Sequence, residues 1–155
     1  MLTPETNARW RAVRPFAWPG IAAIIAGGLV AAAVAHRPVQ ALVWMSAYLV
    51  LIVGVAQIVF GAGQAWLSER APSRGWVTGE WVIFNLGNAG VIAGTLAGSF
   101  DLVAAGTALF ALGIALFLWE VRGGTHRAWL LAYRILLGLV FLSSLVGLVL
   151  TLHAH

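Results

Sequence analysis

The sequence contains no cysteine and no lysine, and charged residues make up only 9% of its 155 residues. The absence of cysteine excludes disulfide bonds, thiolate metal sites and cysteine nucleophiles. Soluble domains contain about a quarter charged residues, whereas 61% of this chain is hydrophobic. So few polar groups cannot cover a surface that faces water, and we therefore expect the lipid bilayer to surround most of the chain.

Catalytic signatures are missing as well. The chain has no glycine-rich phosphate loop, no HExxH, no GxSxG and no pair of carboxylates inside one apolar segment. Ser143 and Ser144 have no base nearby and are expected to hydrogen-bond back to their own helix. The loops are too short to form an extramembrane domain. These absences favour a protein that is not an enzyme, and we expect no cofactor.

Five long apolar segments remain, at about residues 16–35, 39–67, 76–97, 102–121 and 128–152. A helix needs about 20 apolar residues to cross a bilayer. The segments are too long and lack the alternation of a transmembrane barrel, and most lack the polar stripe of a soluble bundle. Backbone groups inside lipid must bond within their own segment. The sequence therefore predicts an all-α integral membrane protein, a single domain of five transmembrane helices over residues 1–155.

The first apolar segment has two interpretations. A basic start before an apolar run is typical of a cleaved signal peptide, and Ala31–Ala35 supplies the small residues that a signal peptidase prefers. The run is nevertheless about 20 residues long, which favours a retained span. In that case the helix is expected to begin near Phe16, with Pro19 in its first turn, where a missing N–H costs least.

The arginines predict an orientation. In a bundle of five spans, most of the arginines in the loops and the N-terminal stretch fall on the same side as the N-terminus, and only Arg37 falls on the other side. Those on the N-terminal side are Arg9, Arg11, Arg14, Arg70, Arg74, Arg122 and Arg127. Basic loops stay in the cytoplasm, so the N-terminus should be cytoplasmic and the C-terminus outside. Arginine without lysine in an Ala- and Gly-rich chain is usual in high-GC bacteria, so the expected location is the bacterial inner membrane. Arginines in short loops do not suggest a nucleic-acid partner.

Several polar side chains fall inside the apolar segments, and we group seven of them as a candidate intramembrane cluster: Gln57, Gln64, Glu80, Asn85, Asn88, Tyr133 and Arg134. A charge at depth is costly and usually faces the bundle interior with a partner. Glu80 and Arg134 lie at similar depth, so we expect them to pair or to share a network with Gln64 and Tyr133. Such a cluster is typical of a proton or ion path or a substrate site. In the alternative, both charges reach the headgroups and the amides only join helices.

Glycines are spaced for close helix packing. Gly54, Gln57, Gly61 and Gln64 follow intervals of 3, 4 and 3 on one helical face, and Gly90, Gly94 and Gly98 form two overlapping GxxxG motifs. The asparagines of the third segment lie on another face from these glycines. We therefore expect the third helix to be held on two sides. The packing is either internal to one protomer or a contact with other copies or other membrane subunits.

Candidate metal ligands are confined to the outer side. His36, Asp101, His153 and His155 are weak candidates for a Zn or Cu ion, and His36 and His153 could reach the edge of a haem. A terminal His-x-His is equally a plain polar tail.

Three functions are compatible with these patterns. The first is a helix-packing accessory protein or homo-oligomeric membrane subunit. The second is a protomer of a small-solute or ion channel or transporter that uses the polar seam of the second, third and fifth helices. The third is a haem- or metal-binding membrane protein that uses the outer histidines. The lipid bilayer is the one partner that all three share.

Overall fold

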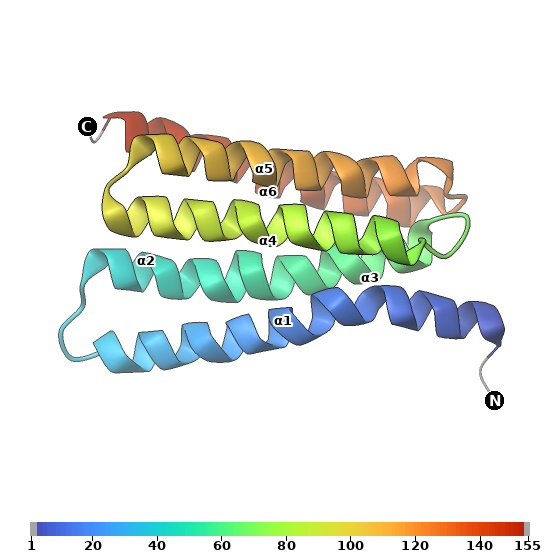
Figure 1. Cartoon of the computed structure of the whole chain (residues 1–155), viewed down its shortest axis with the longest axis horizontal. Coiled ribbons are helices and arrows are strands. Elements are labelled where there is room, and N and C mark those ends of the chain that lie inside the picture. The colour runs from blue at the N-terminus through green and yellow to red at the C-terminus, as the bar shows by residue number, and fades with distance from the viewer. Residues whose placement is uncertain (1–2, 154–155) are drawn as a thin grey trace.

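The computed structural model describes residues 3–153, without the side chains of residues 150, 151 and 153, and its regular elements in this range are all helical. The helices run antiparallel, side by side, along one long axis (Figure 1). The expected all-α class is confirmed. Within the described residues, four helical segments are long and apolar enough to cross a membrane: Pro4–Val34, Gln40–Leu67, Phe100–Gly123 and Arg127–Val149.

Helix α1 (Pro4–Val34) begins well before the expected start near Phe16, so that expectation was wrong. The Thr3 side chain caps it by accepting a hydrogen bond from the Thr6 N–H at 3.2 Å, and Pro4 occupies the first turn, where proline is favoured. Pro15 and Pro19 consequently lie inside the helix. Each removes one N–H from the hydrogen-bond ladder, and α1 bends in this part (Figure 1).

The sequence suggested one regular α-helix for the second apolar segment, and the structure differs from this expectation. The segment consists of α2 (Gln40–Tyr48), a π-helical stretch η1 (Leu49–Ala56) and α3 (Gln57–Leu67), without a break in direction (Figure 1). In η1 the backbone bonds from residue i to i+5, a pattern often found at functional sites. Two polar residues of the interior, Tyr48 and Gln57, stand at its two ends.

Glycines bring α1 against this segment. A Cβ atom built on Gly54 would lie 2.5 Å from the Ile24 side chain, and one on Gly61 would lie 2.5 Å from atoms of Phe16. The Ser46 hydroxyl donates to the Gly27 carbonyl at 2.8 Å. The Gly54–Gly61 face therefore packs within the chain.

Helices α4 (Arg74–Ala97) and α5 (Phe100–Glu120) approach each other even more closely, backbone to backbone. A Cβ on Gly94 would lie 2.6 Å from the Val103 nitrogen, and one on Gly90 would lie 2.9 Å from the Gly106 Cα. Gly98 does not share this contact: its φ of 63° ends α4, and nothing lies within 4 Å of its Cβ position. Gly90 and Gly94 thus pack inside the protomer, whereas Gly98 serves the turn.

The short 3-10 helix η2 (Val121–Gly123) leads to α6 (Arg127–His153). Fully buried phenylalanines from four helices form the core: Phe16, Phe60, Phe84, Phe110 and Phe117. Phe60 stands at its centre, with ring centroids 5.6 to 6.3 Å from those of Phe84, Phe117 and Tyr133. The described buried residues of α6 are Leu130, Tyr133 and Leu137, so this helix is packed in its first half only.

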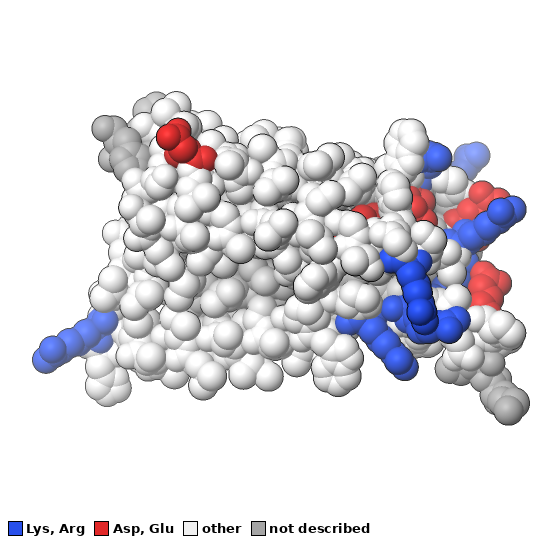
Figure 2. All heavy atoms as spheres, in the orientation of Figure 1, with Lys and Arg blue, Asp and Glu red and all other residues white. Residues whose placement is uncertain are grey.

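Charged side chains gather at one end of the bundle (Figure 2). This end, which we call the arginine-rich end, holds the N-terminus, the 68–73 loop and the 121–126 loop. The long middle of the molecule shows almost no charge in this view.

Arg9 joins α1 to the end of α3 at the arginine-rich end. Its Nη1 donates to the carbonyls of Ala65 at 2.6 Å and Ser68 at 3.2 Å, and its Nη2 forms an ion pair with Glu5 at 2.8 Å. Carbonyl groups in the last turn of a helix have no partner within that helix, so the guanidinium supplies one.

We expect Arg9→Gln to lower the free energy of unfolding by about 1.5–3 kcal/mol, because it removes hydrogen bonds from a charged donor. Arg11→Gln is the matched control, since Arg11 is exposed on the same helix. Reversible unfolding in mixed detergent micelles measures both variants. Equal stabilities for the two would contradict a structural role for the Arg9 bridge.

Candidate functional site

Three polar side chains are fully buried in the half of the bundle that leads to the arginine-rich end. Gln57 and Gln64 are 0% exposed and Glu80 is 1% exposed. The two glutamines lie on one face of α3, two turns apart. The Glu80 Oε1 atom accepts a hydrogen bond from the Trp76 indole N–H at 2.7 Å. Trp76 precedes Glu80 by one turn of α4, so both side chains lie on the same face of that helix.

Tyr133 brings α6 to the same place. Its hydroxyl donates to the Phe60 carbonyl on α3 at 2.9 Å. The Gln64 amide and the Tyr133 hydroxyl are both close enough to the Glu80 carboxyl to interact with it electrostatically. The structure therefore brings together three of the predicted residues from three different helices. We call these residues, Gln64 on α3, Glu80 on α4 and Tyr133 on α6, the cluster.

Much of the hydrogen-bonding capacity of this cluster is unused. Both amide atoms of Gln64 and the Oε2 atom of Glu80 have no hydrogen-bond partner within the described part of the chain, and the same holds for the amide atoms of Gln57, two turns away on α3, and for the Trp81 Nε1. Buried polar atoms are nearly always paired with protein or water, and an unpaired one costs about 1–3 kcal/mol. These atoms can therefore offer hydrogen bonds to water, and the carboxyl can take up a proton.

Arg134 does not belong to the cluster, which contradicts the expected ion pair with Glu80. Its side chain is exposed, and in the described residues the only ion pair is Arg9–Glu5. Adjacent helical residues are rotated by about 100°. Because Tyr133 points into the bundle, Arg134 must point away from it. Glu80, for its part, is buried and does not reach the surface of the bundle.

The two asparagines have different surroundings. Asn88 is buried; its Oδ1 accepts from the Tyr48 hydroxyl on α2 and its Nδ2 donates to the Phe84 carbonyl, both at 2.8 Å. Asn85 is half-buried and donates to the Trp81 carbonyl of its own helix at 2.8 Å. Glu80, Phe84 and Asn88 follow one another on a single face of α4, so the Phe84 ring separates Asn88 from the cluster.

A surface pocket of about 600 Å³ opens at the arginine-rich end, next to the cluster. Trp76 and Glu120 line it, and both also interact with the Glu80 carboxyl. The Arg122 guanidinium lies over the neighbouring Trp119 ring, 3.7 Å from its centroid. One layer of side chains therefore separates Glu80 from this pocket.

Sequence reasoning missed Trp76 and Tyr48 as partners of the buried polar groups. Trp76 had a usable signal, because residues four apart on a helix are neighbours. Tyr48 had none, because its contact with Asn88 joins two helices whose relative rotation is not encoded in spacing.

The outer metal candidates do not form a site in the part of the chain that is described. His36 is exposed in the turn after α1 and Asp101 is exposed near the start of α5, and no group of three possible ligands occurs among the described residues. The His153 side chain and all of His155 lie outside those residues.

Comparisons of the chain with known protein families, curated proteins and solved structures find no match. The geometry therefore carries the functional argument. It offers a carboxyl group that can take up a proton, two amides that can orient water, and a nearby pocket at one end of the bundle.

Proposed function

We propose that the chain is a five-helix protein of a bacterial inner membrane, with α4 as the fifth span, its N-terminus in the cytoplasm and its C-terminus outside. Helix α4 has 24 residues and runs beside α5 over a similar length (Figure 1). Its polar residues reduce its hydropathy, but Glu80 and Asn88 are buried in the bundle. The asymmetric distribution of the arginines supports the orientation.

We further propose that this protein binds and releases a proton at Glu80, as a protomer of a small-solute or ion transporter or channel. The observation that carries the proposal is the full burial of Gln57, Gln64 and Glu80 with unpaired polar atoms. Carboxyl groups inside a membrane protein are rare and usually belong to ion or proton paths.

The local geometry supports a different role for each oxygen of Glu80. Trp76 occupies Oε1, so Oε2, which has no partner in the described part of the chain, is the atom that takes the proton. Protonation removes a charge whose burial is costly. The surface pocket beside Trp76 and Glu120 places water within one side chain of the carboxyl.

Glu80→Gln tests this function in proteoliposomes that contain a pH-sensitive dye. Glutamine resembles the protonated carboxyl in size and neutrality, so the protein should fold, but it cannot release a proton. We expect proton flux to fall by about tenfold or more. Asp101→Asn, at an exposed position near the start of α5, should keep the flux of the parent protein.

A direct readout accompanies the flux measurement. A lipid-soluble carbodiimide modifies protonated carboxyl groups, and peptide mass spectrometry should find the adduct on Glu80 and none on Glu5 or Glu69. Unchanged flux in Glu80→Gln together with an unmodified Glu80 would contradict the proposal.

A helix-packing or oligomeric subunit is the second candidate, and the phenylalanine core favours it. The buried rings of Phe60, Phe84 and Phe117 pack on each other and fill the interior between Asn88 and the cluster. A subunit of this kind would show no flux, and Glu80→Gln would leave its assembly with other copies or other membrane subunits unchanged. The mass of the purified protein in mild detergent measures that assembly.

A further inference from the structure

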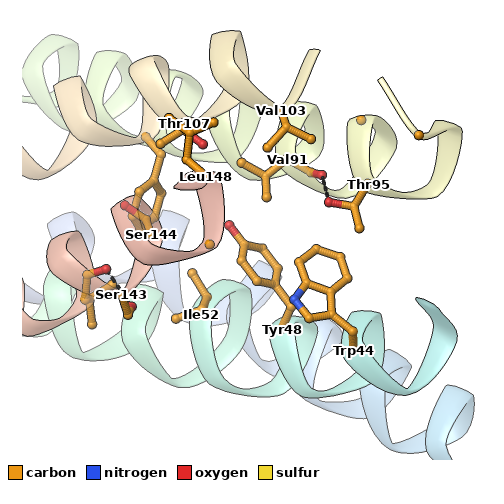
Figure 3. A pocket seen from close by; sticks show the side chains of 15 residues that line it. Trp44, Tyr48, Ile52, Val91, Thr95, Val103, Thr107, Ser143, Ser144 and Leu148 are labelled. Atoms are coloured by element: carbon orange, nitrogen blue, oxygen red, sulfur yellow. Dashed lines mark hydrogen bonds between the residues drawn. The ribbon is translucent and has the colours of Figure 1, made fainter. Parts of the chain in front are cut away.

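A separate cavity lies toward the other end of the bundle, away from Glu80. It has a volume of about 570 Å³, is partly open to the surroundings, and is lined by residues of α2, η1, α4, α5 and the second half of α6 (Figure 3). Its wall includes Trp44, Tyr48 and Ile52 on one side and Thr107, Phe110 and Ser144 on the other.

The cavity exists because α6 lacks large buried side chains in this region. No described residue of α6 beyond Leu137 is buried, and the side that faces the cavity carries small residues, Ser143, Ser144 and Gly147. Helix α4 contributes Gly94 and Gly98 to the opposite wall. Because α6 packs on the bundle only in its first half, the space beneath its second half is next to the surrounding lipid.

The lining combines apolar side chains with hydroxyl groups. The Trp44 and Tyr48 rings stack with centroids 5.0 Å apart and form a flat wall, and the Tyr48 side chain extends into the cavity in Figure 3. The Ser143 and Ser144 hydroxyls donate to carbonyls of their own helix, as expected. Thr107 is 5% exposed and lines the cavity, and no hydrogen bond joins its hydroxyl to the other lining residues drawn in Figure 3. It is therefore available to a ligand.

The size of the cavity decides between two kinds of occupant. A helix about 10 Å wide fills about 420 Å³ per turn, so the cavity has room for little more than one turn of a helix from another copy. Sites for small molecules typically have volumes of about 300–1,000 Å³ and mostly apolar walls with a few polar groups. A small amphiphile can lie wholly within this space, whereas a helix would leave most of its length outside it.

We propose that the cavity binds one amphiphile with a hydrocarbon chain and a terminal hydroxyl, which enters from the bilayer beneath α6 and hydrogen-bonds to Thr107. The chain of the ligand packs against Ile52, Phe110 and the stacked rings. This binding site is separate from Glu80 and does not depend on proton binding there.

The test uses hexadecanol that carries a photoreactive diazirine in its chain, added to the full chain in mild detergent. Peptide mass spectrometry should locate the adduct in residues 44–52 and 140–148. Unlabelled hexadecanol should displace the probe, and phosphatidylcholine, which has acyl chains but no hydroxyl, should not. Equal displacement by both would overturn the proposal, because ordinary lipid would then occupy the cavity.

Two variants locate the ligand. Ser144→Phe fills the cavity and should weaken labelling by about tenfold or more, whereas Leu142→Phe, at a position 57% exposed on the same helix, should not.

Thr107→Val keeps the shape but removes the hydroxyl, and should weaken binding of hexadecanol by about fivefold while leaving labelling by the matching diazirine alkane unchanged. Equal labelling of all variants would overturn the site, and the Thr107 result stands even if Ser144→Phe does not fold.

Discussion

Gly94→Leu should abolish most of the folded protein. A Cβ at this position would already lie 2.6 Å from the Val103 nitrogen and 3.0 Å from the Leu102 carbonyl carbon. These are backbone atoms of α5, which cannot move aside as the end of a flexible side chain can. Overpacking a core costs about 1–3 kcal/mol, and a clash with backbone should reach the upper end of this range or exceed it. In lipid the loss is severe, because helices associate mainly through close van der Waals fit.

The yield of monodisperse protein in mild detergent measures this effect. Leu86→Ile is the control on the same helix, since Leu86 is 57% exposed, and it should be close to neutral. Because Gly94 packs inside the protomer, the variant should lose yield without producing a stable smaller species. A folded variant of smaller assembled mass would instead place the glycine face between copies, and unchanged yield and mass would contradict the packing of α4 on α5.

Phe60→Ala should lower the free energy of unfolding by about 3–5 kcal/mol, the usual cost of removing a buried aromatic ring. Phe60 is fully buried, and its ring contacts Phe84, Phe117 and Tyr133. The loss should come from the ring alone, because the hydrogen bond from Tyr133 goes to the backbone carbonyl of residue 60 and survives the substitution.

Val59→Ala is the matched control, one residue away on the same helix and 39% exposed. Unfolding in mixed micelles should show a much smaller effect for this variant. If both substitutions cost the same, the aromatic cluster does not contribute specifically to the stability of the bundle.

The helical architecture followed from the sequence because chain length inside an apolar segment leaves the backbone few choices. The start of α1 did not follow, because the polar residues before Phe16 were expected to precede the helix. The Thr3-Pro4-Glu5 sequence is in fact a good helix start, and it places two prolines inside the helix.

The sequence predicted how far along the helices the polar residues lie, but not which way their side chains point around the helix axis. Counting residues gives the position of Glu80 along the helix axis, and it placed Glu80 at a level similar to that of Gln64 and Tyr133, which the structure brings near the carboxyl. It also assigned Arg134 to the interior, because similar depth was taken to mean the same side. Rotation about the helix axis depends on which side chains pack first, and the burial of Tyr133 turns its neighbour outward.

The π-helical stretch η1 has a consequence for the relative orientation of the two internal sites. An α-helix rotates by about 100° per residue, and bonding from i to i+5 reduces that rotation. The difference accumulates over residues 49–56 and sets the angular offset between Tyr48 on one side of η1 and Gln57 on the other. A single deletion in η1 that restored α-helical bonding would rotate Gln57 and Gln64 together relative to Trp44 and Tyr48. The winding of these eight residues therefore decides whether the cavity and the buried carboxyl can both receive side chains from one continuous helix.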